Sequence, residues 1–338
     1  MRSNARRNLR CAHARDGTPG RQPPHRRRPV RRRAGAAGAV LPRRAIYTGW
    51  LLGLALFFCA VAGVAQAKDT PRVAVIDWGQ AQTLIAIGAP PVAMSQIPAY
   101  NEWVAAPDVP EGVRDLGLRV QPNMELLSQL DIDVVTITSM YSGLRERLAP
   151  IAPVKTIDIY DGQGAVWDRT VESTRRLGAL VGREAAAEAL IDATQVRIAA
   201  CAAKVPEQVK PLLVVQFMDA RHVRVYTEDS LVGSVLERMD IANAWQDGGN
   251  YWGFATVPLE RLASIDNARM VVVKPLPVGV AEEIDTSVLW HHLPAVNNAP
   301  VLYVPPVWGF GGLPSASRFA RLLVDALGRD CSAGGAAS

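Results

Sequence analysis

A long helical stretch near the middle of this chain, from residue 165 to about residue 205, sets the limits on its architecture. Two glycines, Gly178 and Gly182, interrupt it. Its second part, Arg183–Ala203, is rich in the strong helix formers Ala and Glu and would extend ~30 Å at 1.5 Å per residue. A helix of that length can bridge two separate folding units. We therefore expect one long backbone helix between two lobes.

Short apolar runs alternate with helical segments on both sides of this stretch. The elements expected before it are strands 73–76, 91–94, 134–138 and 155–159 and helices 80–87, 123–129 and 143–149. The elements expected after it are strands 212–217, 223–226, 270–274 and 301–304 and helices 231–239, 259–263 and 315–327. Such alternation is typical of parallel α/β sheets. The predicted fold class is α/β, with two α/β lobes that have central sheets and are joined by the long helix.

Four segments are expected along the chain: a leader over residues 1–67, an N-terminal α/β lobe over 68–165, a helical segment over 166–205 and a C-terminal α/β lobe over 206–338. The 271 residues after the leader are long for one core and suit two lobes. Ligands of open α/β sheets bind outside the carboxyl ends of the strands, so the crevice between the lobes is the expected site.

The leader has the pattern of an export signal. Residues 45–67 hold no charged side chain, follow Arg43-Arg44 and end in Ala65-Gln66-Ala67, which predicts cleavage near Ala67. A retained membrane anchor is the alternative, because ~20 apolar residues can span a bilayer. Twin-arginine export and lipid attachment at Cys59 match less well. Residues 1–40 are rich in Arg, Pro and Gly and are expected to be disordered, with translation starting near Val40 or Leu41.

The charge is divided unevenly between the leader and the rest of the chain. Residues 1–44 hold 14 arginines and one acid, whereas residues 68–338 hold 23 basic and 31 acidic side chains, a net charge of −8. A nucleic-acid surface needs clustered Lys and Arg, so the body of the chain is not expected to bind nucleic acid.

The cysteines, the histidines and the known enzyme motifs give little indication of a catalytic or metal site. Cys201 and Cys331 are the only cysteines after the leader, and the sequence leaves open whether they form a disulfide. The chain has no C-x-x-C, and His222, His291 and His292 do not form a metal-ligand pattern, so no directly bound metal is expected. Phosphate-loop, nucleophile-elbow, zinc-protease and dinucleotide motifs are also missing, which predicts a protein that is not an enzyme and has no cofactor of its own.

Tryptophans are the most informative side chains of the body. There are seven after the leader, several of them next to predicted strand ends or in loops: residues 78, 103, 167, 245, 252, 290 and 308. A single Trp is more often core filler than a ligand contact. Several at loop positions in both halves favour a binding surface for an apolar ligand with a few polar atoms.

Six short segments occur in the order and spacing of a known family: Gly117–Leu127, Tyr141, Ile151–Pro153, Asn243–Gln246, Tyr251–Gly253 and Pro306–Trp308. With them, residues 72–328 resemble the periplasmic ferric hydroxamate siderophore binding proteins that serve ABC importers. The resemblance implies two lobes on a helical backbone and a shallow aromatic cleft. It also implies a monomer that captures an iron(III)-hydroxamate siderophore in the periplasm and delivers it to an inner-membrane ABC permease.

The same resemblance implies roles for single residues. Arg119 and Tyr141 would bind the iron-bound hydroxamate oxygens, and five indoles would form the apolar walls: Trp78, Trp103, Trp245, Trp252 and Trp308. Glu146 and Glu260 would dock on arginines of the permease, although both also fit ordinary helix-start carboxylates. Residues 309–312 depart from the family pattern, which leaves the preferred ligand side arm open.

Charge arithmetic agrees with a hydroxamate ligand. Three hydroxamates neutralise Fe³⁺, so one guanidinium and one phenol are enough to donate hydrogen bonds to the oxygens at the rim of the complex. A tris-catecholate complex would carry about three negative charges and call for several Lys or Arg side chains. For Arg119 the alternative is a structural salt bridge with Asp115 or Glu125. For the whole chain, the alternatives are a haem- or corrinoid-binding relative, with Tyr141 as an iron ligand, and an exported siderophore-modifying enzyme.

Overall fold

The computed structural model describes residues 70–160 and 165–331. The predictions for the leader, including its signal peptide, cleavage site and translation start, lie outside these residues.

The N-terminal lobe is built on a five-stranded sheet in the order β3-β2-β1-β4-β5, with every neighbouring pair parallel. Its strands are β1 (Val73–Val75), β2 (Ala93–Met94), β3 (Arg114–Asp115), β4 (Val134–Ile137) and β5 (Val154–Thr156). Its helices are α2 (Trp78–Ala86), α3 (Ile97–Trp103), α4 (Met124–Ser128), the 3₁₀ helix η1 (Ser139–Leu144) and α5 (Arg145–Leu148). The central strands β1 and β4 are fully buried, as the apolar runs predict.

The C-terminal lobe holds a second five-stranded sheet in the order β10-β9-β6-β7-β8, in which β10, β9 and β6 are parallel and β7 and β8 extend it antiparallel. Its strands are β6 (Leu212–Phe217), β7 (His222–Tyr226), β8 (Phe254–Pro258), β9 (Arg269–Val273) and β10 (Leu302–Val304). Its helices are α8 (Leu231–Arg238), the 3₁₀ helix η2 (Leu259–Ser264), α9 (Val280–Thr286), α10 (Val288–His292), α11 (Pro294–Asn297) and α12 (Leu313–Ala326).

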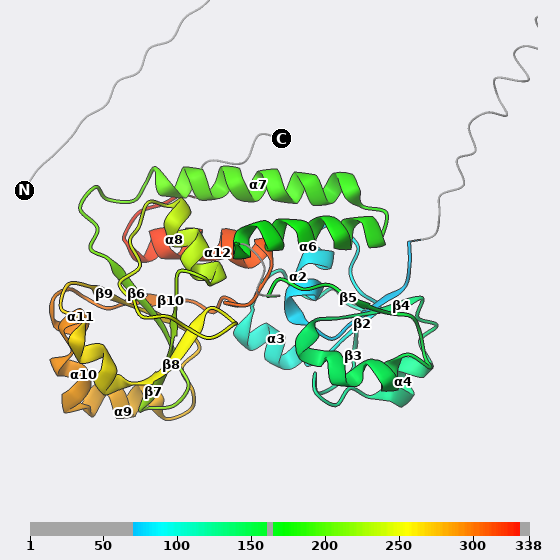
Figure 1. Cartoon of the computed structure of the whole chain (residues 1–338), viewed down its shortest axis with the longest axis horizontal. Helices are drawn as coiled ribbons and strands as arrows, with labels where there is room; N and C mark the ends of the chain where they lie inside the picture. The colour runs from blue at the N-terminus through cyan, green and yellow to red at the C-terminus, as the bar shows by residue number, and fades with distance from the viewer. Residues whose placement is uncertain (1–69, 161–164, 332–338) are drawn as a thin grey trace, which may run out of the picture. The chain divides into compact units, whose positions relative to one another are not determined.

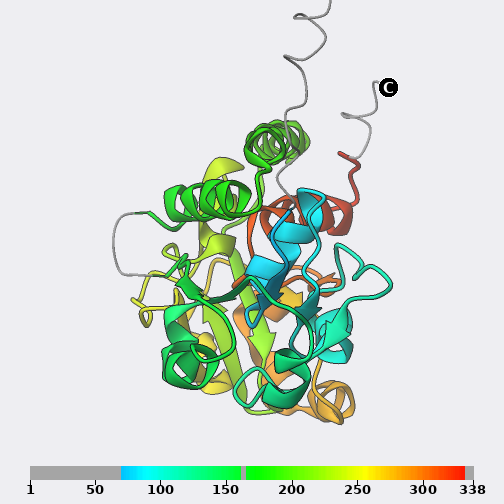
Figure 2. The ribbon, with the colours of Figure 1, turned by 90° about the vertical axis from the view of Figure 1, so that its right-hand side faces the viewer.

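Two antiparallel helices, α6 (Val166–Leu180) and α7 (Glu184–Ala202), lie side by side along both lobes (Figures 1 and 2). Val166 and Trp167 at the start of α6 pack into the core of the C-terminal lobe, whereas Leu177 near its end packs into the core of the N-terminal lobe. Helix α7 returns in the opposite sense, from Ala187 in the N-terminal core to Ile198 in the C-terminal core. The long backbone helix is therefore present, and α6 reinforces it.

The ends of these helices are fixed by local features. Gly182, in the left-handed backbone region at a φ of 64°, makes the turn between α6 and α7. Cys201 at the end of α7 forms a disulfide with Cys331, just beyond α12, so the pairing that the sequence leaves open is made. No helix among the described residues is both long and apolar enough to cross a membrane.

Candidate functional site

Two adjoining hollows of about 850 and 920 Å³ lie between the lobes. Both are lined by Gln96, Arg119, Arg224 and Trp308. We call them together the cleft. Its other lining residues, from both lobes, are Trp78, Ala99, Trp103, Leu118, Val120, Met140, Tyr141, Gln216, Phe217, Met218, Trp252, Phe254, Pro277 and Phe310.

The sheet topology explains why these residues meet. In the N-terminal lobe the cleft residues follow the carboxyl ends of parallel strands: Trp78 comes after β1, Gln96 after β2, Arg119 after β3 and Tyr141 after β4. In the C-terminal lobe, Met218 follows β6 and Trp308 follows β10. The ends of these strands meet at one edge of each sheet, so short connections bring distant residues together.

Arg119 lies on the aromatic floor of the cleft and is partly buried. Its guanidinium carbon stands 3.7 Å from the centre of the Trp78 ring and 5.6 Å from that of Trp308, within cation–π distance of both. Its Nε donates a hydrogen bond of 2.9 Å to Oε1 of Gln96, whose backbone is itself left-handed at a φ of 55°. Arg119 therefore bonds to a neutral amide rather than to Asp115 or Glu125, and its charge remains available to a ligand.

Tyr141 is buried beside Arg119 and is only 5% exposed. Burial raises the pKa of its phenol to about 12, and the neighbouring Asp77 adds to this, while the guanidinium of Arg119 acts in the opposite direction. The phenol is therefore a neutral hydroxyl at physiological pH. It can donate to a ligand oxygen next to the cationic donors of Arg119.

Four of the five expected indoles line the cleft, and they do not play equal parts. Trp103, Trp252 and Trp308 are partly exposed in its wall, whereas Trp78 is only 2% exposed and lies beneath Arg119, with its Nε1 donating to the backbone oxygen of Ser95. Trp245 is not among the lining residues. It is 4% exposed and packs into the core of the C-terminal lobe, so the expectation that it contacts ligand is not met.

The glycine-rich departure at residues 309–312 supplies an aromatic side chain to the cleft. Phe310 lines it and lies 5.3 Å from the ring of Trp308. Gly309 has no room for a side chain, since a Cβ there would stand 2.4 Å from the ring of Tyr226. The absence of a Cβ allows this segment to pass close to the sheet and present both Trp308 and Phe310 to the cleft.

A second arginine, which the sequence analysis does not predict as a site residue, lies in the cleft. Arg224, on β7, lines the cleft from the C-terminal lobe, with its guanidinium 4.6 Å from the centre of the Phe254 ring and 4.9 Å from that of Phe310. Its Nη1 donates to Oε1 of Gln216 across the β6–β7 pair at 3.0 Å. The signal was the alternation Val223-Arg224-Val225-Tyr226, which puts Arg224 and Tyr226 on one face and the two core valines on the other.

A smaller hollow of about 480 Å³ lies beneath the cleft and contains the acidic groups of the site, Asp77 and Asp158. Oδ1 of Asp77 caps α2 by accepting from the backbone N–H groups of Gly79 and Gln80. Burial raises the pKa of Asp77, although these hydrogen bonds and Arg119 oppose the shift. Asp158 accepts from the backbone and hydroxyl of Ser139. Both carboxylates therefore serve local structure.

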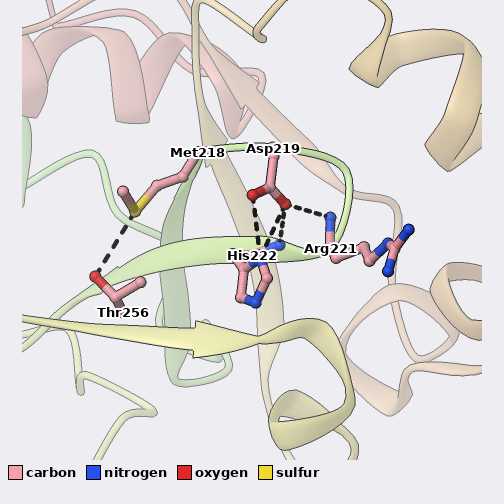
Figure 3. Close-up of polar contacts among 5 residues, drawn as sticks. All are labelled: Met218, Asp219, Arg221, His222 and Thr256. Atoms are coloured by element: carbon pink, nitrogen blue, oxygen red, sulfur yellow. Dashed lines mark hydrogen bonds and ion pairs between the residues drawn. The ribbon is translucent and has the colours of Figure 1, made fainter.

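The tip of the β6–β7 hairpin forms part of the cleft rim. The carboxylate of Asp219 accepts from the backbone N–H groups of Arg221 and His222 and lies 3.0 Å from Nδ1 of His222, which closes the turn (Figure 3). Met218 contacts Thr256 through its sulfur and is 46% exposed. The side chain of Arg221 extends away from Met218, outside the cleft.

The two expected docking carboxylates lie on short helices, one in each lobe. Glu146 is in the first turn of α5 and Glu260 in the first turn of η2, and both side chains are exposed. His291 and His292 are exposed at the end of α10 and bond to nearby backbone oxygens. No group of three or more His, Cys, Asp or Glu among the described residues could hold a metal ion.

The chain is similar to proteins of known role over most of its length. Residues 73–307 match the model of a periplasmic binding protein family. The iron(3+)-hydroxamate-binding protein FhuD of Escherichia coli K12 is 29% identical over 290 residues, covering 86% of this chain and 97% of that protein. The Fe(3+) dicitrate-binding periplasmic protein FecB of the same organism is 23% identical, with 82% and 93% covered.

Solved structures agree with this likeness. The siderophore binding protein FhuD of Vibrio cholerae, bound to Fe3+-Desferal, superposes with a TM-score of 0.73 at 27% identity and covers 77% of this chain and 98% of its own. The triscatecholate siderophore binding protein FeuA of Bacillus subtilis has the same fold, with a TM-score of 0.65 at 14% identity and 79% and 95% covered. The two lobes, their paired sheets and the match over residues 73–307 make this chain a member of the periplasmic binding protein family.

Proposed function

We propose that this protein captures iron(III)-hydroxamate siderophores in the periplasm and delivers them to an ABC permease of the inner membrane. The observation that carries the proposal is the adjacency of Arg119 and Tyr141 on the floor of an aromatic cleft between the lobes. The likeness to two proteins named FhuD supports it.

The chemistry of the cleft suits such a ligand. The hydroxamate oxygens of the complex carry partial negative charge at its rim, where a guanidinium and a neutral phenol can both donate to them. The carbon linkers need apolar contacts, and Leu118, Val120 and Met140 are exposed beside Arg119 for this purpose. Trp252 and Phe254 offer aromatic faces from the other lobe.

Binding without chemistry is part of the proposal. Within residues 70–160 and 165–331, no nucleophile stands beside a general base in the cleft lining, and the two arginines and the phenol there are groups that bind rather than react. Siderophore recovered unchanged after long incubation with the protein is the expected result. A modified siderophore would support the alternative of an exported enzyme.

Tryptophan fluorescence tests the ligand class directly. Trp252 and Trp308 stand in the cleft, so a ferric trihydroxamate should quench their emission in a saturable titration. Haemin and cobalamin serve as competing ligand classes and should not quench at comparable concentrations. Saturable quenching by either of these and not by the trihydroxamate would contradict the proposal.

Delivery to the permease is assigned to Glu146 and Glu260. Exposed carboxylates on the two lobes can pair with arginines on a partner surface. The double variant Glu146→Arg/Glu260→Arg should keep its affinity for the siderophore and lose uptake in cells. Glu184 and Glu282, which are exposed on α7 and α9, give a matched control with the same change in charge. Uptake that is equal in the two double variants would refute the assignment.

A further inference from the structure

Among the described residues that line the cleft above its deeper hollow, the charged side chains are two arginines. One comes from each lobe: Arg119 from the segment after β3, and Arg224 from β7. A neutral trihydroxamate complex needs one such group at its rim. A second guanidinium, contributed by the other lobe, therefore indicates that the ligand has a further group with negative charge.

The surroundings of Arg119 keep its charge uncompensated by a direct partner. Its Nε donates to the neutral amide oxygen of Gln96, and the neutral phenol of Tyr141 lies beside it. The rings of Trp78 and Trp308 hold its guanidinium in place.

The surroundings of Arg224 repeat this arrangement with different residues. Its Nη1 donates to the amide oxygen of Gln216, which also accepts from the hydroxyl of Tyr226. The rings of Phe254 and Phe310 hold its guanidinium in place. Each lobe thus presents one arginine that donates to a glutamine and lies against two aromatic rings.

No carboxylate of the described residues lies within ion-pair distance of either guanidinium. The nearest acidic groups of the site, Asp77 and Asp158, line the deeper hollow and accept hydrogen bonds from local backbone. Arg119 also lines that hollow, where its charge opposes the rise in the pKa of Asp77, whereas Arg224 does not line it. Two partly buried positive charges that line the same hollow repel, and an anion bound between them removes that repulsion.

We propose, building on the proposed function, that the cleft prefers ferric chelates with net negative charge, in which a carboxylate-bearing group replaces one hydroxamate, and that Arg224 is the residue that selects for this charge. Replacing one hydroxamate by an α-hydroxycarboxylate, which brings two negative charges to the iron, leaves the complex with a net negative charge. Arg119 and Tyr141 then hold the hydroxamate rim, while Arg224 donates to the carboxylate from the opposite wall.

The test compares two probes on three proteins, each purified after expression of the full chain. The probes are a neutral cyclic ferric trihydroxamate and the ferric complex of a citrate-centred dihydroxamate. The proteins are the wild type, Arg224→Gln and the control Arg221→Gln, which removes the same charge from the same hairpin but outside the cleft. Titration calorimetry gives the affinities, and thermal unfolding verifies the fold of each variant.

Arg224→Gln should weaken binding of the negative chelate ~10–100-fold, the scale of one charge-assisted hydrogen bond, and that of the neutral chelate by less than ~3-fold. Arg221→Gln should change both by less than ~3-fold. Equal losses for the two probes in Arg224→Gln, or no loss for either, would overturn the inference. If the wild-type protein binds the neutral chelate more tightly than the negative one, the inference is overturned while the proposed function stays in place. Wild type that binds neither chelate would remove both.

A second measurement needs no variant. The affinity of the wild type for the negative chelate should fall as salt rises from ~0.05 to ~0.5 M, because exposed parts of the charge attraction are screened, while affinity for the neutral chelate stays nearly constant. Parallel salt dependences for the two probes would contradict the role of charge.

Discussion

At the scale of single residues, the site depends on how Arg119 is held. Stacking on Trp78 and a bond to Gln96 fix the guanidinium before any ligand arrives, so little side-chain entropy remains to be lost on binding. Such preorganisation explains why an arginine without a carboxylate partner is partly buried here.

Arg119→Ala should weaken binding of a ferric trihydroxamate by ~1.5–3 kcal/mol, the scale of a hydrogen bond to a charged group. Titration calorimetry measures the loss. Arg114→Ala, an exposed arginine on β3 outside the cleft, is the control and should bind like the wild type. Equal affinity in Arg119→Ala and the control would show that the site lies elsewhere.

Tyr141 gives a pH prediction of definite sign. An exposed phenol is about half ionised at pH 10, but burial raises the pKa of Tyr141 to about 12, so its hydroxyl keeps its proton and still donates at pH 10. Affinity for the trihydroxamate should therefore stay level from pH 7 to 10. The measurement is a series of fluorescence titrations across that range, with Tyr141→Phe as the reference that lacks the group. Affinity that declines by pH 10 in the wild type and not in the reference would contradict the buried, neutral phenol.

Residues of the site differ in how far a sequence can predict them. Arg119 is identified by a segment that resembles a known family, and the structure places it in the cleft. The alternation of β7 shows that Arg224 lies on the face opposite Val223 and Val225, but it does not tell whether that face borders a cleft or solvent. Trp245 is the opposite case: it is expected in the cleft but lies in the core, and its position beside a loop in the sequence does not show where its ring points.

At the scale of elements, the buried strands are predictable and the small peripheral elements are not. The strand β6 has the predicted bounds because six consecutive buried residues make a continuous apolar run. Helix α3 is not predicted from the sequence, because it is only seven residues long and contains Pro98. The edge strand β8 is not predicted either, because it is half exposed and follows a glycine-rich loop.

The contact between α6 and α7 gives a prediction about packing. Gly178 faces Ala187, and a Cβ at residue 178 would stand 2.6 Å from the Cβ of Ala187. Although Gly→Ala usually stabilises a helix, Gly178→Ala should lower the free energy of unfolding by ~1–3 kcal/mol, because the helices must move apart.

The double variant Gly178→Ala/Ala187→Gly restores the space and isolates the overlap. In a cycle of urea unfolding experiments, it should be more stable than the sum of the two single changes predicts. Strictly additive effects would show that the two helices do not meet at this point.

These paired helices also limit how far the lobes can close on a ligand. Both pack into the cores of the two lobes, and neither has a flexible segment in its interior that could act as a hinge. We expect small-angle scattering curves with and without ferric trihydroxamate to be nearly the same. A large decrease in the radius of gyration on binding would contradict a rigid backbone.

At the scale of the whole molecule, the disulfide joins two distant parts of the chain. Cys201 and Cys331 are 130 residues apart, and the bridge ties the end of the backbone helix to the end of the described chain. Replacing both by Ala should lower the free energy of unfolding by ~2–4 kcal/mol, the usual contribution of a native bridge. Neither residue lines the cleft, so ligand affinity should change less than ~2-fold. Urea unfolding that is unaffected by the replacement would show that the bridge adds no stability.

The position of the iron in a crystal of the protein with a ferric trihydroxamate tests the central proposal, that the cleft between the lobes is the binding site. Anomalous scattering at the iron edge, from crystals grown with a ferric trihydroxamate, should give one strong peak in the cleft, with Arg119 and Tyr141 on one side and Trp252 on the other. A peak on any outer surface, or a cleft without iron while ligand is bound elsewhere, would contradict it.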